Sequence, residues 1–335
     1  MSAAAPTLLV LGAGSWGTAL AVLLARHGAR VRLWGHLRED IERLRQDREN
    51  RQFLPGARLP DAVEPTTDLA QAAYGIDEAL VVVPSHAFRQ VLVALRDVLD
   101  PGISVSWATK GFEPGTGLLL NEVAAEVLPG RDLAVLSGPS FAGEVARGLP
   151  TAVTVASTSG GHAERLARYL HGDTFRAYTS DDLVGVQVGG AAKNVMAIAA
   201  GIADGLGFGA NARAALITRG LAEITRLGLA LGGRAETFMG LAGLGDLVLT
   251  CTDNQSRNRR MGLALARGLS VEAARAEIGQ EVEGVATARE VQLKSRALAV
   301  EMPITEQTFR VLHESLAPLA AVQALLGRRQ RPEAD

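Results

Sequence analysis

One lysine lies in a stretch of the chain that is otherwise suited to a buried helix. Residues 188–205 read VGGAAKNVMAIAAGIADG, and Lys193 is the only ionisable side chain among the first sixteen of them. A helix that is apolar on nearly every side is normally buried, and burying an unpaired ammonium group is costly. Lys193 therefore needs a compensating group from elsewhere in the chain, unless it reaches along the helix to solvent.

Lysine is also rare in this chain. Of the 34 lysine and arginine residues only three are lysines, at positions 110, 193 and 294. Arginine stays protonated in proteins, whereas the pKa of lysine can be lowered, so lysine can give or take a proton where arginine cannot. Each lysine that persists is a candidate for acid–base chemistry, and Lys193 is the first of them.

A possible partner for Lys193 lies in a second apolar stretch. Asp246 stands in GLAGLGDLVLTC, and a buried aspartate needs a cation as much as Lys193 needs an anion. Further along, Ser256, Arg257 and Asn258 open a predicted helix. Guanidinium binds phosphate through two hydrogen bonds and a helix N-terminus adds free N–H donors, so these three residues could form a phosphate site. The alternative is a solvated basic turn.

Residues 12–17, GAGSWG, form a glycine-rich turn between a predicted strand, Leu8–Leu11, and a predicted helix that ends near Gly28. In the dinucleotide-binding pattern the first glycine makes the turn, the second lets a pyrophosphate approach the backbone, and the third lets helix and strand pack closely. Gly12, Gly14 and Gly17 match that pattern. The alternative is a turn that matters only for packing.

The next predicted strand, RVRLW, ends without an acidic residue. Sites specific for NAD usually carry Asp or Glu at this point, to bind the ribose hydroxyls. Here the position falls on Gly35 or His36, and no carboxylate repels a 2′-phosphate. His36 or Arg38 could attract that phosphate, so the sequence favours an enzyme that accepts NADPH, with NADH left open.

Two further segments follow predicted strands of the same sheet. Lys110 lies in WATKGFEPGTG, and residues 138–142 read GPSFA. Ligands of parallel sheets bind beyond the carboxyl ends of the strands, so Lys110 is expected to point toward the cofactor crevice. The second segment could offer backbone N–H groups and a hydroxyl to the substrate or the nicotinamide. Each segment, taken alone, could equally be a structural turn.

The elements that must position these residues change in character along the chain. Buried-strand runs alternate with helical stretches in the first half, which predicts an α/β fold with a doubly wound, mostly parallel sheet and helices on both faces. After about Thr179 the pattern is helical, with few strand signals. We therefore expect a dinucleotide-binding domain at residues 1–180, a helical substrate and catalytic domain at 181–328, and a frayed tail at 329–335. The predicted strands after the first two cover residues 78–85, 102–109, 133–138 and 151–157, with helices at 87–99 and 118–128.

Composition narrows the class of protein. A chain of 335 residues can bury two cores, and its formal net charge of -2 leaves no electrostatic footprint for nucleic acid or an anionic membrane surface. The single cysteine, Cys251, cannot form an intramolecular disulfide, which fits a reducing compartment. The uncharged stretch 2–25 is interrupted by the glycine-rich turn, so we expect a cytoplasmic protein without a targeting segment, and we predict no metal site.

Taken together, the motifs resemble those of bacterial NAD(P)-dependent sn-glycerol-3-phosphate dehydrogenase over roughly residues 8–326. That resemblance implies a Rossmann-type domain followed by a helical domain like that of 6-phosphogluconate dehydrogenase. It also implies a homodimer that interconverts dihydroxyacetone phosphate and sn-glycerol 3-phosphate with NAD or NADP, supplying the backbone for phospholipid synthesis. The segments that carry it are GAGSWGTALA, VVVPSHAFR, ATKGFE, SGPSFAGEVA, GGAAKNVMAIAAGIADGLGFGANARAALITRGLAEI, GLAGLGDLVLTCTDNQSRNRRMG and GQEVEGVATA.

The resemblance also assigns residues. Lys193 matches the catalytic lysine, which would donate a proton to the substrate oxygen while Asp246 holds it and Lys110 polarises the carbonyl. Two ammonium groups this close would also lower each other's pKa. Two positions before Glu283, where the family usually has an apolar residue, this chain has Glu281. The change affects the contact that this position makes with the cofactor in the family. The positions matching substrate contacts are Lys110, Gly138, Ser140, Asp246, Ser256, Arg257 and Asn258, and those matching cofactor contacts are Ser15, Trp16, His36, Lys110, Ala142, Arg257 and Glu283.

Two other functions remain open at this point. A related two-domain dehydrogenase could act on a keto acid or a hydroxy acid, but it needs a carboxylate clamp, and a Ser-Arg-Asn cluster at a helix start suits phosphate better. A cofactor-binding sensor without turnover is expected to have lost its catalytic positions, whereas Lys110, Lys193 and Asp246 are all present.

Overall fold

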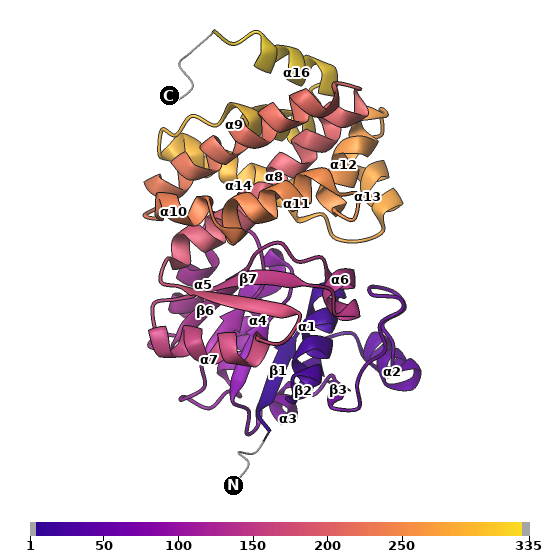
Figure 1. Ribbon diagram of the computed structural model, residues 1–335, viewed down its shortest axis with the longest axis vertical. Helices are drawn as coiled ribbons and strands as arrows, with labels where there is room; N and C mark the ends of the chain where they lie inside the picture. Colours follow the sequence, from indigo (N-terminus) through magenta and orange to yellow (C-terminus); the bar gives the residue numbers. More distant parts are fainter. Residues whose placement is uncertain (1–4, 330–335) are drawn as a thin grey trace.

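The first half of the chain forms one eight-stranded sheet flanked by helices (Figure 1). The structure is a computed structural model and describes residues 5–329. The strand order is β3-β2-β1-β4-β5-β6-β7-β8, and every neighbouring pair is parallel except β6 with β7. Because β1 lies between β2 and β4, the strand order reverses there, at the position where doubly wound sheets bind ligands. The strands are β1 Thr7–Leu11, β2 Arg30–Trp34, β3 Val63–Thr66, β4 Glu78–Val81, β5 Val105–Trp107, β6 Leu133–Ser137, β7 Thr151–Ser157 and β8 Phe175–Ser180.

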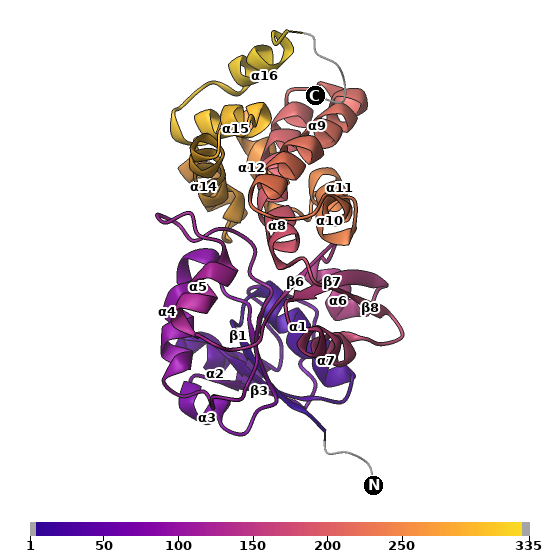
Figure 2. The same cartoon turned by 90° about the vertical axis from the view of Figure 1, so that its left-hand side faces the viewer.

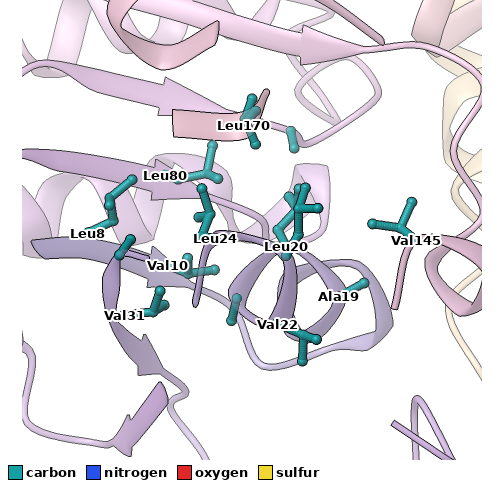
Figure 3. Close-up of a cluster of buried hydrophobic side chains, with 14 of the residues drawn as sticks. Leu8, Val10, Ala19, Leu20, Val22, Leu24, Val31, Leu80, Val145 and Leu170 are labelled. Atoms are coloured by element: carbon teal, nitrogen blue, oxygen red, sulfur yellow. The ribbon is translucent and has the colours of Figure 1, made fainter. Parts of the chain in front are cut away.

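Helices cover both faces of this sheet. Figure 2 shows α4 and α5 on one side of it and α1 and α7 on the other. Leu8 of β1 packs with Leu20 and Leu24 of α1 in a buried cluster (Figure 3). Burial on both faces is the reason that Leu8–Leu11 form a continuous apolar run rather than an alternating one. The helices are α1 Ser15–Arg26, α2 Arg38–Asp47, α3 Leu69–Ala73, α4 Ser85–Arg96, α5 Leu120–Val127, α6 Ala142–Arg147 and α7 Gly160–Leu170.

The second half is helical, as Figure 1 shows above the sheet domain, so the predicted fold class is confirmed. Near the C-terminus, the last two helices, α15 and α16, are separated by a turn in which Ser315 has a φ of 56°. Of the predicted tail, residues 330–335 lie outside the described residues. The elements are α8 Leu183–Gly205, α9 Gly209–Ala230, α10 Ala235–Phe238, the π-helical turn η1 Leu241–Gly245, α11 Asp246–Thr252, α12 Arg257–Ala266, α13 Val271–Ile278, α14 Glu283–Ala297, α15 Pro303–His313 and α16 Pro318–Leu326.

The helix α8 is the axis of the helical domain. Asp182 caps its N-terminus by accepting a hydrogen bond from Gly185 N at 2.8 Å. Close approach to α12 depends on glycine, because a Cβ on Gly201 would lie 2.2 Å from the Arg259 carbonyl oxygen. Among the described helices α8 alone is long and apolar enough to cross a membrane, and 89% of its apolar window is buried inside the protein. It is therefore a core helix.

The loop at residues 110–119, which we call the strap, joins the two domains. It leaves the sheet after β5 and reaches α14 (Figure 2), where Gly115 N donates to Glu290 Oε1 at 3.1 Å. Phe112 and Leu119 are buried in the apolar cluster of the helical domain, although their chain neighbours belong to the sheet domain. The strap therefore fixes Lys110, its first residue, between the two domains.

Candidate active site

Lys110, Lys193 and Asp246, which the sequence predicts to be catalytic, meet at the interface between the two domains. Lys193 on α8 donates a hydrogen bond to Asp246 Oδ1, and Lys110 on the strap donates to Asp246 Oδ2 at 2.6 Å. The predicted pairing of Lys193 with Asp246 is therefore confirmed. Asp246 and Lys193 are buried, whereas Lys110 keeps 18% of its side chain exposed. One carboxylate thus bridges two ammonium groups, and one of these groups borders solvent.

Three separate elements place these side chains. Asp246 is the first residue of α11, directly after the π-helical turn η1. Gly190, one helical turn before Lys193, lets the sheet domain approach α8, because a Cβ there would lie 2.5 Å from Ser137 Oγ and 3.7 Å from Lys110 Cγ. The carboxyl end of the sheet therefore meets the middle of α8 at the lysine pair.

Burial and neighbouring charges set the protonation of this cluster. Burial lowers the pKa of Lys193 to about 7, with the nearby Lys110 charge acting in the same direction and Asp246 opposing it. Burial disfavours ionisation of Asp246, but Lys110 and Lys193 together hold the pKa of its carboxyl below the usual range. At neutral pH the aspartate is ionised and Lys193 can release a proton, which is the condition for a general acid.

Thr250 completes the surroundings of Lys193 and was not predicted from the sequence. Lys193 Nζ donates to Thr250 Oγ1 at 2.8 Å, and that hydroxyl donates to the Asp246 carbonyl oxygen at 2.6 Å. The available signal was its spacing, since a residue four positions after Asp246 on a helix lies on the same face. Thr250 directs the ammonium group alongside the carboxylate.

The glycine-rich turn has the geometry of an anion site. Gly12 has a φ of 121°, and a Cβ there would lie 2.4 Å from the Val82 carbonyl oxygen. A Cβ on Gly17 would lie 1.8 Å from the Gly12 oxygen, so the third glycine serves packing. At Gly14, by contrast, a Cβ would meet nothing within 4 Å. The space over Gly14 and the first turn of α1 is open, which fits a pyrophosphate on the helix N-terminus.

The other predicted cofactor residues of the sheet domain lie around that turn. Ser15 Oγ donates to the Phe53 carbonyl oxygen at 2.6 Å, and Trp16 is half-buried against the core beside α1. His36 is exposed in the loop after β2. Arg38, the alternative reader of a 2′-phosphate, forms an exposed pair with Glu42 at 2.8 Å.

The segment after β6 lies against Lys110. The Gly138 carbonyl oxygen accepts hydrogen bonds from Lys110 Nζ at 3.2 Å and from Ser140 Oγ at 3.0 Å. Gly138 has a φ of 144°, a backbone conformation that favours glycine. Ala142 is the first residue of α6. Gly138 and Ser140 are therefore beside the lysine pair, as expected of residues that contact a substrate.

The three residues of the predicted phosphate cluster differ in how their side chains are engaged. Ser256 caps α12 by accepting from Arg259 N at 3.1 Å. Asn258 donates to Asn194 Oδ1 at 2.9 Å and accepts from Gly284 N at 2.9 Å, so its amide ties α12 to α8 and α14. Arg257 forms no hydrogen bond or ion pair with residues 5–329, and burial lowers its pKa. A half-buried guanidinium without a partner is suited to an anionic ligand.

Glu283 links the two domains near Arg257. Its Oε2 accepts a hydrogen bond from Ser85 Oγ, at the start of α4, at 3.1 Å. Burial raises the pKa of Glu283 to about 7, and the charge of Glu281 adds to the shift. The exposed Glu281 therefore changes the electrostatics of Glu283.

The residues present fit a nicotinamide dinucleotide on three counts. The turn at Gly14 is open, the first turn of α1 presents free N–H groups, and the lysine pair lies beyond the carboxyl end of the same sheet. Among residues 5–329 no group of three or more His, Cys, Asp or Glu side chains is placed to hold a metal ion.

Comparison with known proteins covers nearly the whole chain. Residues 7–163 match the model of the NAD-dependent glycerol-3-phosphate dehydrogenase N-terminus, and residues 182–323 match that of the C-terminus. A glycerol-3-phosphate dehydrogenase [NAD(P)+] of Pseudoalteromonas translucida is 57% identical over 335 residues, which are 99% of this chain and 100% of the relative. One from Thioalkalivibrio sulfidiphilus is 59% identical over 329 residues, 98% and 99% of the two chains.

A solved structure agrees with these relatives. The crystal structure of a glycerol-3-phosphate dehydrogenase from Coxiella burnetii is 48% identical, has a TM-score of 0.94, and covers 97% of this chain and 99% of that chain. The similarity spans the sheet domain, the lysine pair and the helical domain alike. The chain therefore belongs to the family of NAD-dependent glycerol-3-phosphate dehydrogenases.

Proposed function

We propose that Lys193, Asp246 and Lys110 carry out the reaction of this family, the interconversion of dihydroxyacetone phosphate and sn-glycerol 3-phosphate with NAD(P)H. The observation that carries this assignment is the buried carboxylate of Asp246 bridging the two ammonium groups. A bound reduced nicotinamide supplies the hydride that adds to the central carbonyl carbon. The protein must then stabilise and protonate the carbonyl oxygen.

Lys193 is the proton donor in this proposal. As the hydride reaches the carbon, the C–O π bond breaks and negative charge gathers on the oxygen, to which Lys193 Nζ gives a proton. The pKa of about 7 places that proton within reach of transfer at neutral pH. Lys110, which borders solvent, polarises the same oxygen and orients the substrate, while Asp246 keeps both ammonium groups in place.

Arg257 holds the substrate phosphate in this proposal. Support comes from its place at the start of α12, its half-buried guanidinium and the absence of an ion-pair partner among the described residues. Asn258 already donates to Asn194, whereas the Ser256 hydroxyl only accepts, from Arg259 N, and keeps its own donor. The phosphate site is thus the Arg257 guanidinium at a helix N-terminus, with the Ser256 hydroxyl as a further donor.

We further propose that the enzyme accepts NADPH at least as well as NADH, acts in the cytoplasm as a homodimer and supplies glycerophosphate for phospholipid synthesis. The missing acid after β2 supports the cofactor preference. An apolar α16 supports self-association, since its Leu319 and Leu326 are 49% and 73% exposed.

Absorbance at the reduced-nicotinamide band tests the reaction. Purified protein should oxidise NADPH with dihydroxyacetone phosphate and act far more slowly on unphosphorylated dihydroxyacetone. Equal rates with the two would contradict the phosphate site. No turnover with either would contradict the assigned reaction, and keto acids in the same assay give the comparison with related dehydrogenases.

A further inference from the structure

Asn50 is a buried polar residue in contact with the glycine-rich turn, although 36 residues separate it from Gly14. Its Nδ2 donates to the Ala13 carbonyl oxygen at 2.9 Å and to Thr18 Oγ1 at 2.8 Å. Its Oδ1 accepts from Phe53 N at 3.1 Å. All hydrogen-bonding groups of this amide are therefore used, and two of the three bonds reach the turn and the helix that follows it.

The bond to Ala13 decides which way one peptide group faces. In a planar trans peptide the C=O and the following N–H point in opposite directions. Because Asn50 holds the Ala13 oxygen toward the protein, the Gly14 N–H is directed to the other side. That N–H has no acceptor among the described residues, and a Cβ on Gly14 would meet nothing within 4 Å. The Gly14 N–H is therefore a free donor, and the Cβ side of the same residue is open.

The chain around Asn50 is anchored to the same turn a second time. Ser15, the first residue of α1, donates through its hydroxyl to the Phe53 carbonyl oxygen at 2.6 Å. Asn50 and Phe53 thereby enclose the turn between two side-chain hydrogen bonds that run in opposite directions. The orientation of the Ala13–Gly14 peptide is therefore set before any ligand binds.

We propose that Asn50 is a positioning residue for the cofactor pyrophosphate, which aims the Gly14 N–H at the anion by holding the Ala13 carbonyl away from it. Without Asn50 that carbonyl is free to turn, and its partial negative charge can then face the phosphates. The proposal rests on assigning this turn to the cofactor. It adds a residue that lies outside the glycine-rich motif.

The test compares Asn50→Leu with Thr18→Val. Asn50→Leu removes all three hydrogen bonds of the amide, including the one to the Ala13 carbonyl, whereas Thr18→Val removes only the one to Thr18. The double variant Asn50→Leu/Thr18→Val removes the hydroxyl that the first change leaves unpaired, so it keeps the comparison valid if the single variant folds poorly. Calorimetric titration with NADPH gives Kd, inorganic pyrophosphate as a competitor reports the anion site, and thermal unfolding reports stability.

Asn50→Leu and the double variant should raise the Kd of NADPH by about 10- to 100-fold, the loss expected for one hydrogen bond to a charged group. Competition by pyrophosphate should weaken in parallel, while kcat at saturating NADPH stays near the wild-type value. Thr18→Val should lower Tm without changing Kd. Unchanged affinity in the double variant, or an equal loss in Thr18→Val, would overturn the proposal. Failure of the wild-type protein to bind NADPH would instead overturn the cofactor assignment.

Discussion

Lys193 and Asp246, 53 positions apart in the chain, form an ion pair whose side chains are only 8% and 1% exposed. Removing one partner of a buried pair leaves the other as an uncompensated charge. Because Asp246 also binds Lys110, the three residues act as a unit, and the effects of changing them will not add. The predictions about the lysines follow from this arrangement.

Replacing Lys193 with Arg, Met or Ala should lower kcat by about a hundredfold or more, since a general acid contributes about 10² to 10⁴. Arg keeps the charge but cannot transfer its proton, and Met and Ala lose both. Steady-state kinetics with dihydroxyacetone phosphate measure kcat, and titration with NADPH should show little change. Lys294→Met is the matched control, because Lys294 lies on α14 outside the site.

A stable and active Lys193→Met enzyme would contradict this role and leave α8 as a core helix only. Pairing each change with Asp246→Asn separates a lost proton donor from a stranded carboxylate, since the double variant removes the uncompensated charge.

The rate of substrate reduction should fall as pH rises through about 7. Burial lowers the pKa of Lys193 to about 7, and the donor must be protonated to act, so activity is fully present below that pH and lost above it. Lys110→Met removes a neighbouring positive charge and should move the midpoint to higher pH. The substrate phosphate titrates identically in both measurements, so the difference between the two profiles of kcat belongs to the enzyme. Coincident midpoints would show that another group sets the profile.

Gly14→Ala and Gly17→Ala should fail in different ways. A Cβ at Gly17 would lie 1.8 Å from a backbone oxygen, so that change should destabilise the protein by about 1 to 3 kcal/mol or more. The space at Gly14 is open, so its variant should keep its Tm but raise the Kd of NADPH by about tenfold or more as the methyl group enters the anion site. Thermal unfolding without ligand and calorimetric titration separate the two results. A Gly14 variant that loses stability but binds NADPH normally would show that the cofactor does not bind at this turn.

Arg257→Leu should weaken transition-state binding of dihydroxyacetone phosphate by about 2 to 5 kcal/mol. The same change should have little effect on the slow reduction of unphosphorylated dihydroxyacetone, because only the phosphate is bound by the guanidinium. Ratios of kcat/KM for the two substrates measure the difference. Arg275→Leu, an exposed arginine on α13, controls for the loss of a positive charge. Equal losses on both substrates would remove Arg257 from the phosphate site.

The ratio of kcat/KM for NADPH to that for NADH should fall several-fold in His36→Ala with Arg38→Ala. Both side chains lie after β2, where an acid normally selects NAD, and Arg38 is engaged only by an exposed pair with Glu42. Glu42→Gln should raise the same ratio by releasing Arg38. If neither variant changes the ratio, residues other than His36 and Arg38 bind the 2′-phosphate.

Lys193 and Asp246 could be anticipated because each is an isolated charge in an apolar stretch and demands a partner, whereas Lys110 was expected near the site from its position after a predicted strand. Asn50 could not be anticipated and Thr250 offered only its spacing from Asp246, because neither type is unusual at a surface and their roles depend on contacts with Ala13 and Lys193. The same limit applies to Asn258, whose spacing next to Arg257 suggested phosphate. Its bonds to Asn194 and Gly284 exist only in the folded chain.

The strands at both edges of the sheet were also missed, for a physical reason. β3 reads VEPT, and its proline removes a donor and obscures the strand pattern, which an edge strand tolerates. In β8 only Phe175 is buried, so the strand lacks the apolar run of a central one. The antiparallel pairing of β6 with β7 depends on a short connection through α6 that carries no clear signal. A central strand is recognised in the sequence by its run of apolar residues, and an edge strand, which is less buried, lacks that run.

The strap has a consequence for how this architecture can be recombined. Phe112 and Leu119 belong by chain position to the nucleotide-binding half but by packing to the core of the other half. A fusion made at the chain junction near residue 181 would therefore pair a helical core with two foreign side chains, even if every helix came from one parent. In a chimera of two relatives, residues 110–119 should therefore come from the same parent as the helical half. Such a chimera needs this loop exchanged within the sheet domain in addition to the crossover near residue 181.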